Sequence, residues 1–258
     1  TNIEGYNMIA NYAVYYNSNA FELIPKEKYN KELMNYMVKG NFDGLEKTPN
    51  EFIDRELVKL AVDNGFDLTA EAVKFVDYDI AFKALDNNAL YNIQFIPKEL
   101  FDNELSCWAV IHKISLKDIP NKFVDKELAL LALNNDGLDI KYVSKKLIDS
   151  DVAYAAVSNN IKAFEYIPQN VITKEIADVV AHKNGLYLVN VPSDLVNYNM
   201  LVDGIYEDQN YVMKDKKIVY ECNGQDLGIR DYMKYKKELY KQYFDNKLVE
   251  KAYQEAND

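Results

Sequence analysis

The chain has 258 residues, of which 48% are apolar and 28% are charged, and this balance excludes an intrinsically disordered protein. No apolar run is long enough to cross a bilayer, so no membrane partner is expected. The formal net charge of -11, from 41 acidic and 30 basic residues, argues against direct binding to nucleic acid, which favours a basic surface.

The first expected element is an N-terminal capping helix within residues 1–17. Ala13 and Val14 occupy the place where each later unit of the chain has a small residue followed by an apolar one. We therefore interpret this segment as a half-unit that caps the repeat array described next.

The location of the protein is predicted from its leader and its cysteines. The first twenty residues carry no basic segment followed by an apolar block, so no signal peptide is visible. Cys107 and Cys222 do not make a disulfide framework, which favours free thiols in a reducing compartment. A cytoplasmic location is expected, with a leader removed before Thr1 as the alternative.

Residues 18–205 contain a repeat of about 24 residues, aligned on the residue that follows a short apolar pair in each unit. Five positions later, every unit has an Asn, Asp or Thr, whose side chains accept hydrogen bonds from the first N–H groups of a helix. An acid follows two positions later in most units and would interact favourably with the helix dipole. The recurring Asp-x-acid pair is therefore predicted to start a helix, whereas a metal or acid–base site would not recur in nearly every unit. The aligned residues are Pro25, Pro49, Ala72, Pro97, Pro120, Ser144, Pro168 and Pro192, and the predicted N-caps are Asn30, Asp54, Asp77, Asp102, Asp125, Asp149, Thr173 and Asn197.

After each predicted cap, apolar residues recur at offsets of three, four, seven and eight, which is one face of an α-helix of about three turns. The residue at offset seven is usually alanine, which lets neighbouring helices approach closely. Gly65, Gly137 and Gly185 are expected to end their helices. The next eleven or so residues hold enough apolar positions for a short second helix. The sequence thus predicts an all-α solenoid of about eight stacked helical hairpins.

The frame of the units is D-x-[ED]-apolar, then A-[VL], then [ND]-G, then [LF]-x-x-[VI]-[PS]. It resembles short bacterial and viral α-helical repeats that are known only as a domain of unknown function. The resemblance covers residues 18–205 and is clearest over residues 97–192. It implies an α-solenoid-like fold, but it implies no activity and no catalytic residues, because none is attached to that repeat.

Residues 206–258 follow the repeats and are predicted to be a C-terminal cap. Residues 211–224 fit either a small β-hairpin or a degenerate ninth helix capped by Asp215, and both alternatives stay open. A long helix from residue 226 to about residue 256 is expected to pack over the end of the array. Its basic stretch is expected to be a solvated helix face with internal ion pairs, with a contact for an acidic partner as the alternative. This stretch comprises Lys234, Lys236, Lys237 and Lys241.

No catalytic residue, cofactor or metal ligand is predicted. His112 and His182 lie in different units, and neither cysteine has a second cysteine nearby, so no spacing typical of a transition-metal site occurs. The sequence also contains no Gly-rich phosphate loop and no nucleophile motif. An unrecognised enzyme is therefore the weakest of the hypotheses for this protein.

Offsets five and six from each cap vary among the units, whereas their neighbours do not. Aromatic residues there are candidate partner-binding anchors, because aromatic side chains dominate interface hot spots; the alternative is that they fill gaps between units. The leading hypothesis is a non-enzymatic repeat protein that binds another protein through an elongated surface, for example as a phage or bacterial effector or inhibitor. The second is an acidic decoy that mimics nucleic acid and inhibits a nucleic-acid-binding complex, such as a defence complex. The candidate anchors are Tyr36, Phe82, Trp108 and Tyr154.

Overall fold

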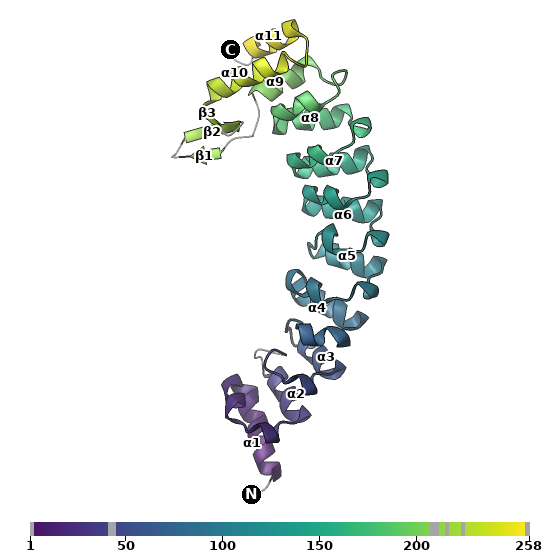
Figure 1. The fold of residues 1–258 in the computed structure, drawn as a ribbon, viewed down its shortest axis with the longest axis vertical. Coiled ribbons are helices and arrows are strands. Elements are labelled where there is room, and N and C mark those ends of the chain that lie inside the picture. Colours follow the sequence, from purple (N-terminus) through teal and green to yellow (C-terminus); the bar gives the residue numbers. More distant parts are fainter. Residues whose placement is uncertain (1–2, 41–44, 207–211, 215–216, 223–224, 256–258) are drawn as a thin grey trace. The chain divides into compact units, whose positions relative to one another are not determined.

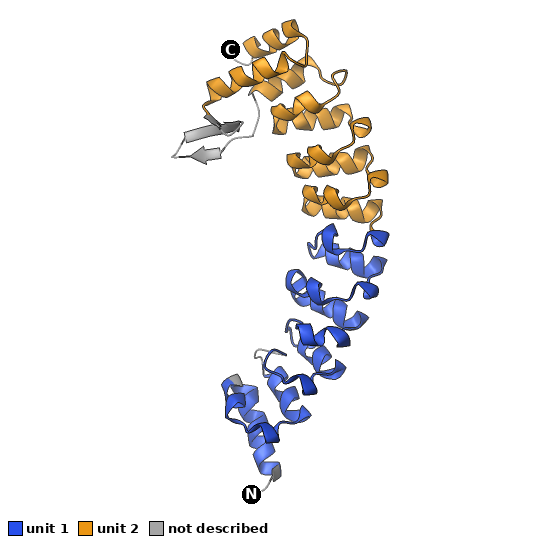
Figure 2. Ribbon diagram, viewed as in Figure 1, with its two compact units in different colours: residues 1–123 blue, residues 124–258 orange. Residues whose placement is uncertain are grey.

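The computed structural model describes residues 3–40, 45–206, 212–214, 217–222 and 225–255 (Figure 1). The chain divides into unit 1, residues 1–123, and unit 2, residues 124–258 (Figure 2). Within each unit, consecutive α-helices of the array pack against each other, which confirms the predicted all-α repeat architecture.

Unit 1 alternates α-helices with short 3-10 helices. Its α-helices are α1 (Ile3–Tyr16), α2 (Lys31–Lys39), α3 (Arg55–Asp63), α4 (Tyr78–Asn92) and α5 (Asn103–Ile111). Its 3-10 helices are η1 (Ser18–Leu23), η2 (Lys26–Lys28), η3 (Asn50–Phe52), η4 (Ala70–Phe75), η5 (Ile93–Phe95), η6 (Lys98–Leu100), η7 (Leu116–Asp118) and η8 (Asn121–Phe123).

Unit 2 continues the same alternation and then ends in a small sheet and two further helices. Its array contains α6 (Lys126–Asn135), η9 (Gly137–Tyr142), η10 (Lys145–Leu147), α7 (Ser150–Asn159), η11 (Ile161–Tyr166), η12 (Gln169–Val171), α8 (Lys174–Lys183), η13 (Gly185–Asn190) and α9 (Tyr198–Tyr206). The end comprises β1 (Val212–Lys214), β2 (Lys217–Cys222), β3 (Gln225–Leu227), α10 (Ile229–Tyr240) and α11 (Asn246–Glu255).

The side chains at the eight predicted N-cap positions all cap a helix. Each accepts a hydrogen bond from the backbone N–H three residues later, at 2.8–3.4 Å. This bond satisfies one of the N–H groups that a helix leaves unpaired at its start. The helix-start interpretation of the Asp-x-acid pair is therefore confirmed.

Replacing the cap Asp125 with alanine is expected to lower the free energy of unfolding by about 1 kcal/mol. The substitution removes the acceptor for the Leu128 N–H, which Asp125 Oδ1 binds at 2.8 Å. Urea unfolding of the variant measures the loss, and Asp125→Asn, which keeps an acceptor oxygen, should change stability much less. An equal loss in both variants would contradict a capping role.

The short second helix predicted in each unit is present, but it is a 3-10 helix and not an α-helix. The residues between one α-helix and the next cap form 3-10 helices, in most units a pair of them, such as η9 and η10. The residue before the second of the pair is extended, with φ -59° and ψ 132° at Ser144, so no helix runs through it. Leu147 N–H then bonds to the Ser144 carbonyl at 2.8 Å, which is the tight i to i+3 pattern. The second layer of each repeat is therefore made of tight turns.

The buried face of each repeat is the one that the sequence pattern predicts. In α6 it comprises Leu128, Ala129, Ala132 and Leu133, whose side chains are at most 7% exposed. The alanines at offset seven of the repeats are no more than 1% exposed. Small side chains at this position bring neighbouring helices close together, and the core of each unit therefore runs from repeat to repeat.

Glycines serve the array in two different ways. Gly65 follows α3 with φ +86°, a conformation that favours glycine, as predicted for a helix end. Gly137 and Gly185 instead begin 3-10 helices and lie against the backbone of the next repeat. A Cβ atom on Gly137 would overlap the carbonyl oxygen of Ala156, and one on Gly185 would overlap that of Gly204. Glycine is therefore required at these two positions by close packing.

Inter-repeat links join the first helical residue of one repeat to the N-cap aspartate of the next. Arg55 Nε donates to Asp77 at 2.6 Å, and the Tyr78 hydroxyl donates to Asp102 at 2.9 Å. Lys31 pairs with the Asp54 cap in the same way. In unit 2, the Lys126 ammonium lies 2.6 Å from the Asp149 cap. These cap carboxylates therefore bind a helix start and the preceding repeat at once.

The inter-repeat link at Asp149 predicts a pH dependence of stability. The hydrogen bond from Lys126 and that from the Val152 N–H hold the pKa of Asp149 below its usual range. A carboxyl whose folded pKa is lowered stabilises the fold above its unfolded pKa, and this contribution is lost as the pH falls through the folded pKa. Asp149→Asn keeps a side-chain oxygen that can cap the helix but removes the titrating carboxyl. We expect the free energy of unfolding of this variant to decrease less steeply than that of the wild type as the pH falls below about 4. An unchanged slope in a folded Asp149→Asn variant would contradict this role of Asp149.

The strands in the C-terminal part of unit 2 decide between the two sequence alternatives for this segment. β1 pairs with β2 and β2 with β3, both antiparallel, with Val212 opposite Val219 and Tyr220 opposite Leu227. The segment therefore forms strands, as the β-hairpin alternative predicted, and not a degenerate ninth helix. The sheet has three strands in the described residues, one more than a hairpin. The proposed cap of that helix, Asp215, lies outside the described residues.

The prediction of one long terminal helix is wrong, because the segment forms two helices, α10 and α11. Asp245 starts the second one by accepting a hydrogen bond from the Leu248 N–H at 3.0 Å. A residue that caps a new helix interrupts the apolar pattern only briefly, so the two helices look like one in the sequence. Both α10 and α11 contact α9, the last helix of the array, and therefore cover its end.

The basic stretch of α10 is only partly a solvated face, so this prediction is wrong for Lys236. The Lys236 side chain is fully buried, its ammonium donates to the Gly204 carbonyl, and it lies 4.6 Å from the centre of the Tyr232 ring. Lys237 and Lys241 instead pair with Glu250 of α11, at 2.8 and 2.5 Å. The lysines therefore join α10 to the array and to α11.

Candidate functional site

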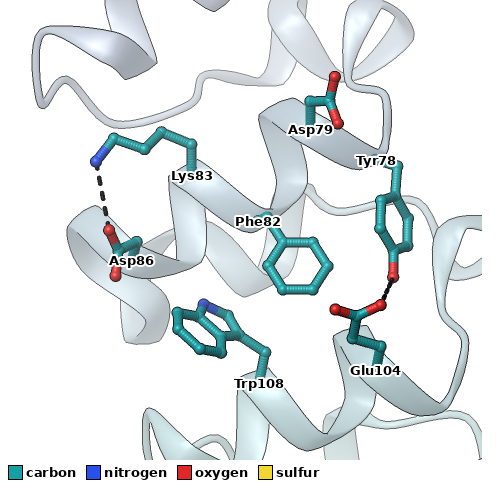
Figure 3. Close-up of a pocket in the computed structure, with 7 residues that line it drawn as sticks. All are labelled: Tyr78, Asp79, Phe82, Lys83, Asp86, Glu104 and Trp108. Carbon is teal, nitrogen blue, oxygen red and sulfur yellow. Dashed lines mark hydrogen bonds and ion pairs between the residues drawn. The ribbon is translucent and has the colours of Figure 1, made fainter.

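The strongest candidate site is a groove of about 370 Å³ between α4 and α5, two neighbouring helices of unit 1 (Figure 3). We call it the aromatic groove. It lies on the helix surfaces beside the buried face, where offsets five and six of the two repeats meet. Its lining residues are Tyr78, Asp79, Phe82, Lys83 and Asp86 from α4, and Glu104 and Trp108 from α5.

Two of the predicted anchors, Phe82 and Trp108, are in contact in this groove. Their ring centres are 5.7 Å apart, and the rings are tilted by 45° (Figure 3). Tyr78 and His112 extend the row, at 5.0 Å from Phe82 and 4.9 Å from Trp108. Phe82 and Trp108 are both half-buried, so they pack against each other across the two repeats and still present a surface.

The indole nitrogen of Trp108, Nε1, is a buried hydrogen-bond donor without an acceptor among the described residues. An unpaired buried donor costs free energy that a well-formed core would avoid. The indole is therefore not held in place by a hydrogen bond of its own, and the neighbouring rings position it.

Carboxylates surround the aromatic row. The Tyr78 hydroxyl, which donates to Asp102, also lies 3.5 Å from Glu104 (Figure 3). Burial and the bond to Asp102 raise the pKa of Tyr78 to about 12, so the phenol stays protonated and remains a donor at neutral pH. On the other side, Asp86 lies 3.3 Å from the Lys83 ammonium and 3.7 Å from His112 Nε2.

The polar groups in and near the groove are carboxylates, one ammonium, a phenol, an imidazole and a thiol. Cys107 is exposed and free, and the Nδ1 atom of His112 lies 2.9 Å from the Trp108 carbonyl oxygen in the same helix. Across the described part of the chain, no three His, Cys, Asp or Glu side chains gather as a metal ion would require. The lining of the groove therefore combines aromatic rings with carboxylates and one lysine ammonium.

The other two predicted anchors lie elsewhere. Tyr36 in α2 packs against Tyr12 and Tyr15 of α1, with ring centres 6.0 and 6.4 Å away. Tyr154 is on α7 in unit 2, with 47% of its surface exposed. For Tyr36 the gap-filling alternative describes the contacts well, whereas Tyr154 is a solvent-exposed ring.

Sequence reasoning missed the rim of the aromatic groove. Tyr78 gave no signal because it is the first helical residue, a position outside the repeat pattern that holds Lys, Arg, Asn, Ser or Tyr in the other repeats. Glu104 and Asp79 belong to the recurring first-turn acids, which the capping pattern explains already. The sequence does contain a signal for the groove. The repeats that hold Phe82 and Trp108 are the only two adjacent repeats that both have an aromatic residue at offset five or six.

Residues 125–172 match the family model of a domain of unknown function, DUF4116. The DUF4116 match begins at the N-cap of α6 and ends directly before the N-cap of α8, so it covers two whole repeats. The predicted resemblance to a domain of unknown function is thus confirmed for this part of the chain. Neither the curated proteins nor the solved structures gave a significant match. None of the helices in the described part of the chain combines the length and the apolar character needed to cross a bilayer.

Proposed function

We propose that this chain is a non-catalytic repeat protein that binds another protein, and that the aromatic groove is its main anchor site. The observation that carries the proposal is the half-buried pair of Phe82 and Trp108 on adjacent repeats. Clustered aromatic side chains at partly desolvated positions contribute most of the binding energy in many interfaces. A repeat array also offers contact area without an enclosed pocket.

The core of these two repeats does not depend on the anchor rings. Ile80, Ala84, Leu105 and Ala109 are at most 1% exposed and form the buried faces of α4 and α5. Phe82 and Trp108 lie beside this core, so their loss should affect a partner more than it affects folding.

We expect a Phe82→Ala and Trp108→Ala double variant to bind the partner at least roughly thirtyfold more weakly, as hot-spot rings do. The measurement uses a photo-crosslinking residue at position 86 to identify the partner in cells of the source organism. Binding of that purified partner to the double variant is then titrated. Leu90→Ala, which removes a side chain that is 72% exposed on the same helix, is the control and should bind normally. Full binding by a folded double variant would refute the anchor role.

The acidic decoy that mimics nucleic acid is supported by the net charge of -11. Its second support, a ridge of open carboxylates at the helix starts, is weaker, because the inter-repeat links hold four of the cap aspartates. A decoy should lose its target steeply as salt rises from about 0.05 M to about 0.5 M, whereas an anchor-based interface should tolerate the change. The same titration therefore separates the two functions.

A role as an inhibitor from a phage or a bacterium stays a proposal that depends on the resemblance of the repeats alone. A cytoplasmic location is likewise proposed. Its support is Cys107, a free thiol on the surface, because exposed thiols persist in reducing compartments.

A further inference from the structure

We propose that the aromatic groove receives an arginine side chain from a basic segment of the partner. This inference rests on the proposed function and adds the chemistry of the partner to it. It joins two observations, an excess of carboxylates around the groove and aromatic rings whose faces carry no cation from the chain itself.

The groove is negatively charged and is not neutralised by its surroundings. Three carboxylates line it, from Asp79, Asp86 and Glu104, against one ammonium from Lys83, which gives a formal charge of -2. Lys83 is already engaged, 3.3 Å from Asp86. Asp79 and Glu104 are exposed and make no ion pair among the described residues. A cationic group that enters the groove would therefore meet the Asp79 and Glu104 carboxylates, neither of which is bound in an ion pair within the described part of the chain, although Glu104 lies 3.5 Å from the Tyr78 hydroxyl.

The two central rings of the groove, Phe82 and Trp108, have no lysine ammonium over their faces among the described residues. Among the described residues, seven rings have a lysine ammonium over them, for example Tyr253 with Lys237 at 4.4 Å. Neither Phe82 nor Trp108 is one of these, although tryptophan gives the strongest contacts of this kind. A cation from a partner would therefore not compete with a lysine of the described chain for these two ring faces.

Arginine fits the arrangement better than lysine does. Its guanidinium is planar, so one face can lie on a ring while the N–H groups at its edge point to carboxylates. The groove offers both features side by side, with the ring row between Asp86 and Glu104 (Figure 3). A lysine ammonium is a compact and strongly hydrated charge, which would gain less from the ring faces.

The chain contains a single tryptophan, Trp108, and this allows a direct test. The probes are three short, otherwise identical glycine-rich peptides whose two cationic residues are arginine, lysine or the uncharged isostere citrulline. We expect the arginine peptide to change Trp108 fluorescence saturably, with an affinity roughly tenfold above that of the citrulline peptide. The lysine peptide should lie between them.

Charge variants of the intact chain locate the site. Asp79→Asn with Glu104→Gln should weaken arginine-peptide binding roughly tenfold while keeping the side-chain shapes. Glu127→Gln is the matched control, because Glu127 occupies in α6 the position that Glu104 occupies in α5. It should leave binding unchanged. Thermal unfolding of each variant shows that the fold is intact.

Two results would overturn the inference. One is a Trp108 signal that does not respond to the arginine peptide, and the other is equal binding of the arginine and citrulline peptides. Either result leaves the proposed function separately testable, because loss of the crosslinked partner in the Phe82→Ala and Trp108→Ala double variant would still support an aromatic anchor. Failure of both experiments would reject the groove as a binding site.

Discussion

Gly137→Ala is expected to lower the free energy of unfolding by about 3 kcal/mol, at the upper end of the usual cost of overpacking. The new methyl group would overlap the carbonyl oxygen of Ala156 and would lie 2.9 Å from the backbone nitrogen of Asn160. Both atoms belong to the backbone of the next repeat, so they cannot rotate away as a flexible side chain could. The two repeats must move apart, and contacts along their shared core are lost.

Urea unfolding measures the loss at Gly137, and Gly228→Ala provides the matched control. Gly228 has an ordinary φ of -69°, and nothing lies within 4 Å of the place its Cβ would take. Because Gly228 is the N-cap of α10 and alanine is a poorer cap, its substitution should cost up to about 1 kcal/mol, well below the loss at Gly137. Equal effects at the two glycines would show that close backbone packing is not the cause.

Leu105→Ala is expected to cost about 3 kcal/mol, within the range of about 2–5 kcal/mol measured for such truncations in protein cores. Leu105 is fully buried at offset three of α5 and fills the space between neighbouring repeats. Truncation removes buried apolar surface and leaves a cavity, because a tightly packed interior relaxes only in part.

Hydrogen exchange locates the damage that Leu105→Ala causes. In a repeat protein each repeat contacts mainly its neighbours, so the amides of α4 and α5 should exchange faster before other repeats of unit 1 do. Leu90→Ala on α4 is the control, since Leu90 is 72% exposed. A uniform increase across unit 1 would instead indicate that unit 1 unfolds as one cooperative body.

The helix starts could be predicted because capping is local chemistry. A side-chain oxygen at one position and an N–H three residues later need no tertiary context, and Asp125 and Asn30 therefore behave as their residue types predict. The buried helix faces were predictable for a related reason, since a period of 3.6 residues is visible over about three turns.

The turns and the buried lysine could not be predicted in the same way. A segment such as η10 has three residues, which is too short to show any period. Lys236 lies four residues from both Tyr232 and Tyr240, on the buried face of α10. Lysine side chains are mostly exposed in proteins, so the sequence predicts an exposed side chain at this position. The carbonyl of Gly204, which approaches from α9, accepts a hydrogen bond from the Lys236 ammonium, and this tertiary contact is not visible in the sequence.

The aromatic groove was predicted in part. Phe82 and Trp108 were chosen as exposed aromatic positions, and the repeat spacing brings them onto adjacent helices. The carboxylates beside these rings were not predicted. Asp79 and Glu104 are first-turn acids like those of most repeats, so nothing in the sequence marks them as part of a site. Which side chains of α4 face which of α5 depends on how the two helices pack, and the sequence pattern contains no information on that.

The inter-repeat links have a consequence for how such a chain can evolve. Donor and acceptor always occupy the same two places in their repeats, the first helical residue and the following cap. Tandem duplication or deletion of one copy within residues 54–148 would therefore leave each remaining donor opposite an aspartate cap. Genes for this protein could gain or lose copies by recombination without a matching change elsewhere, so related chains are expected to vary in length by whole copies.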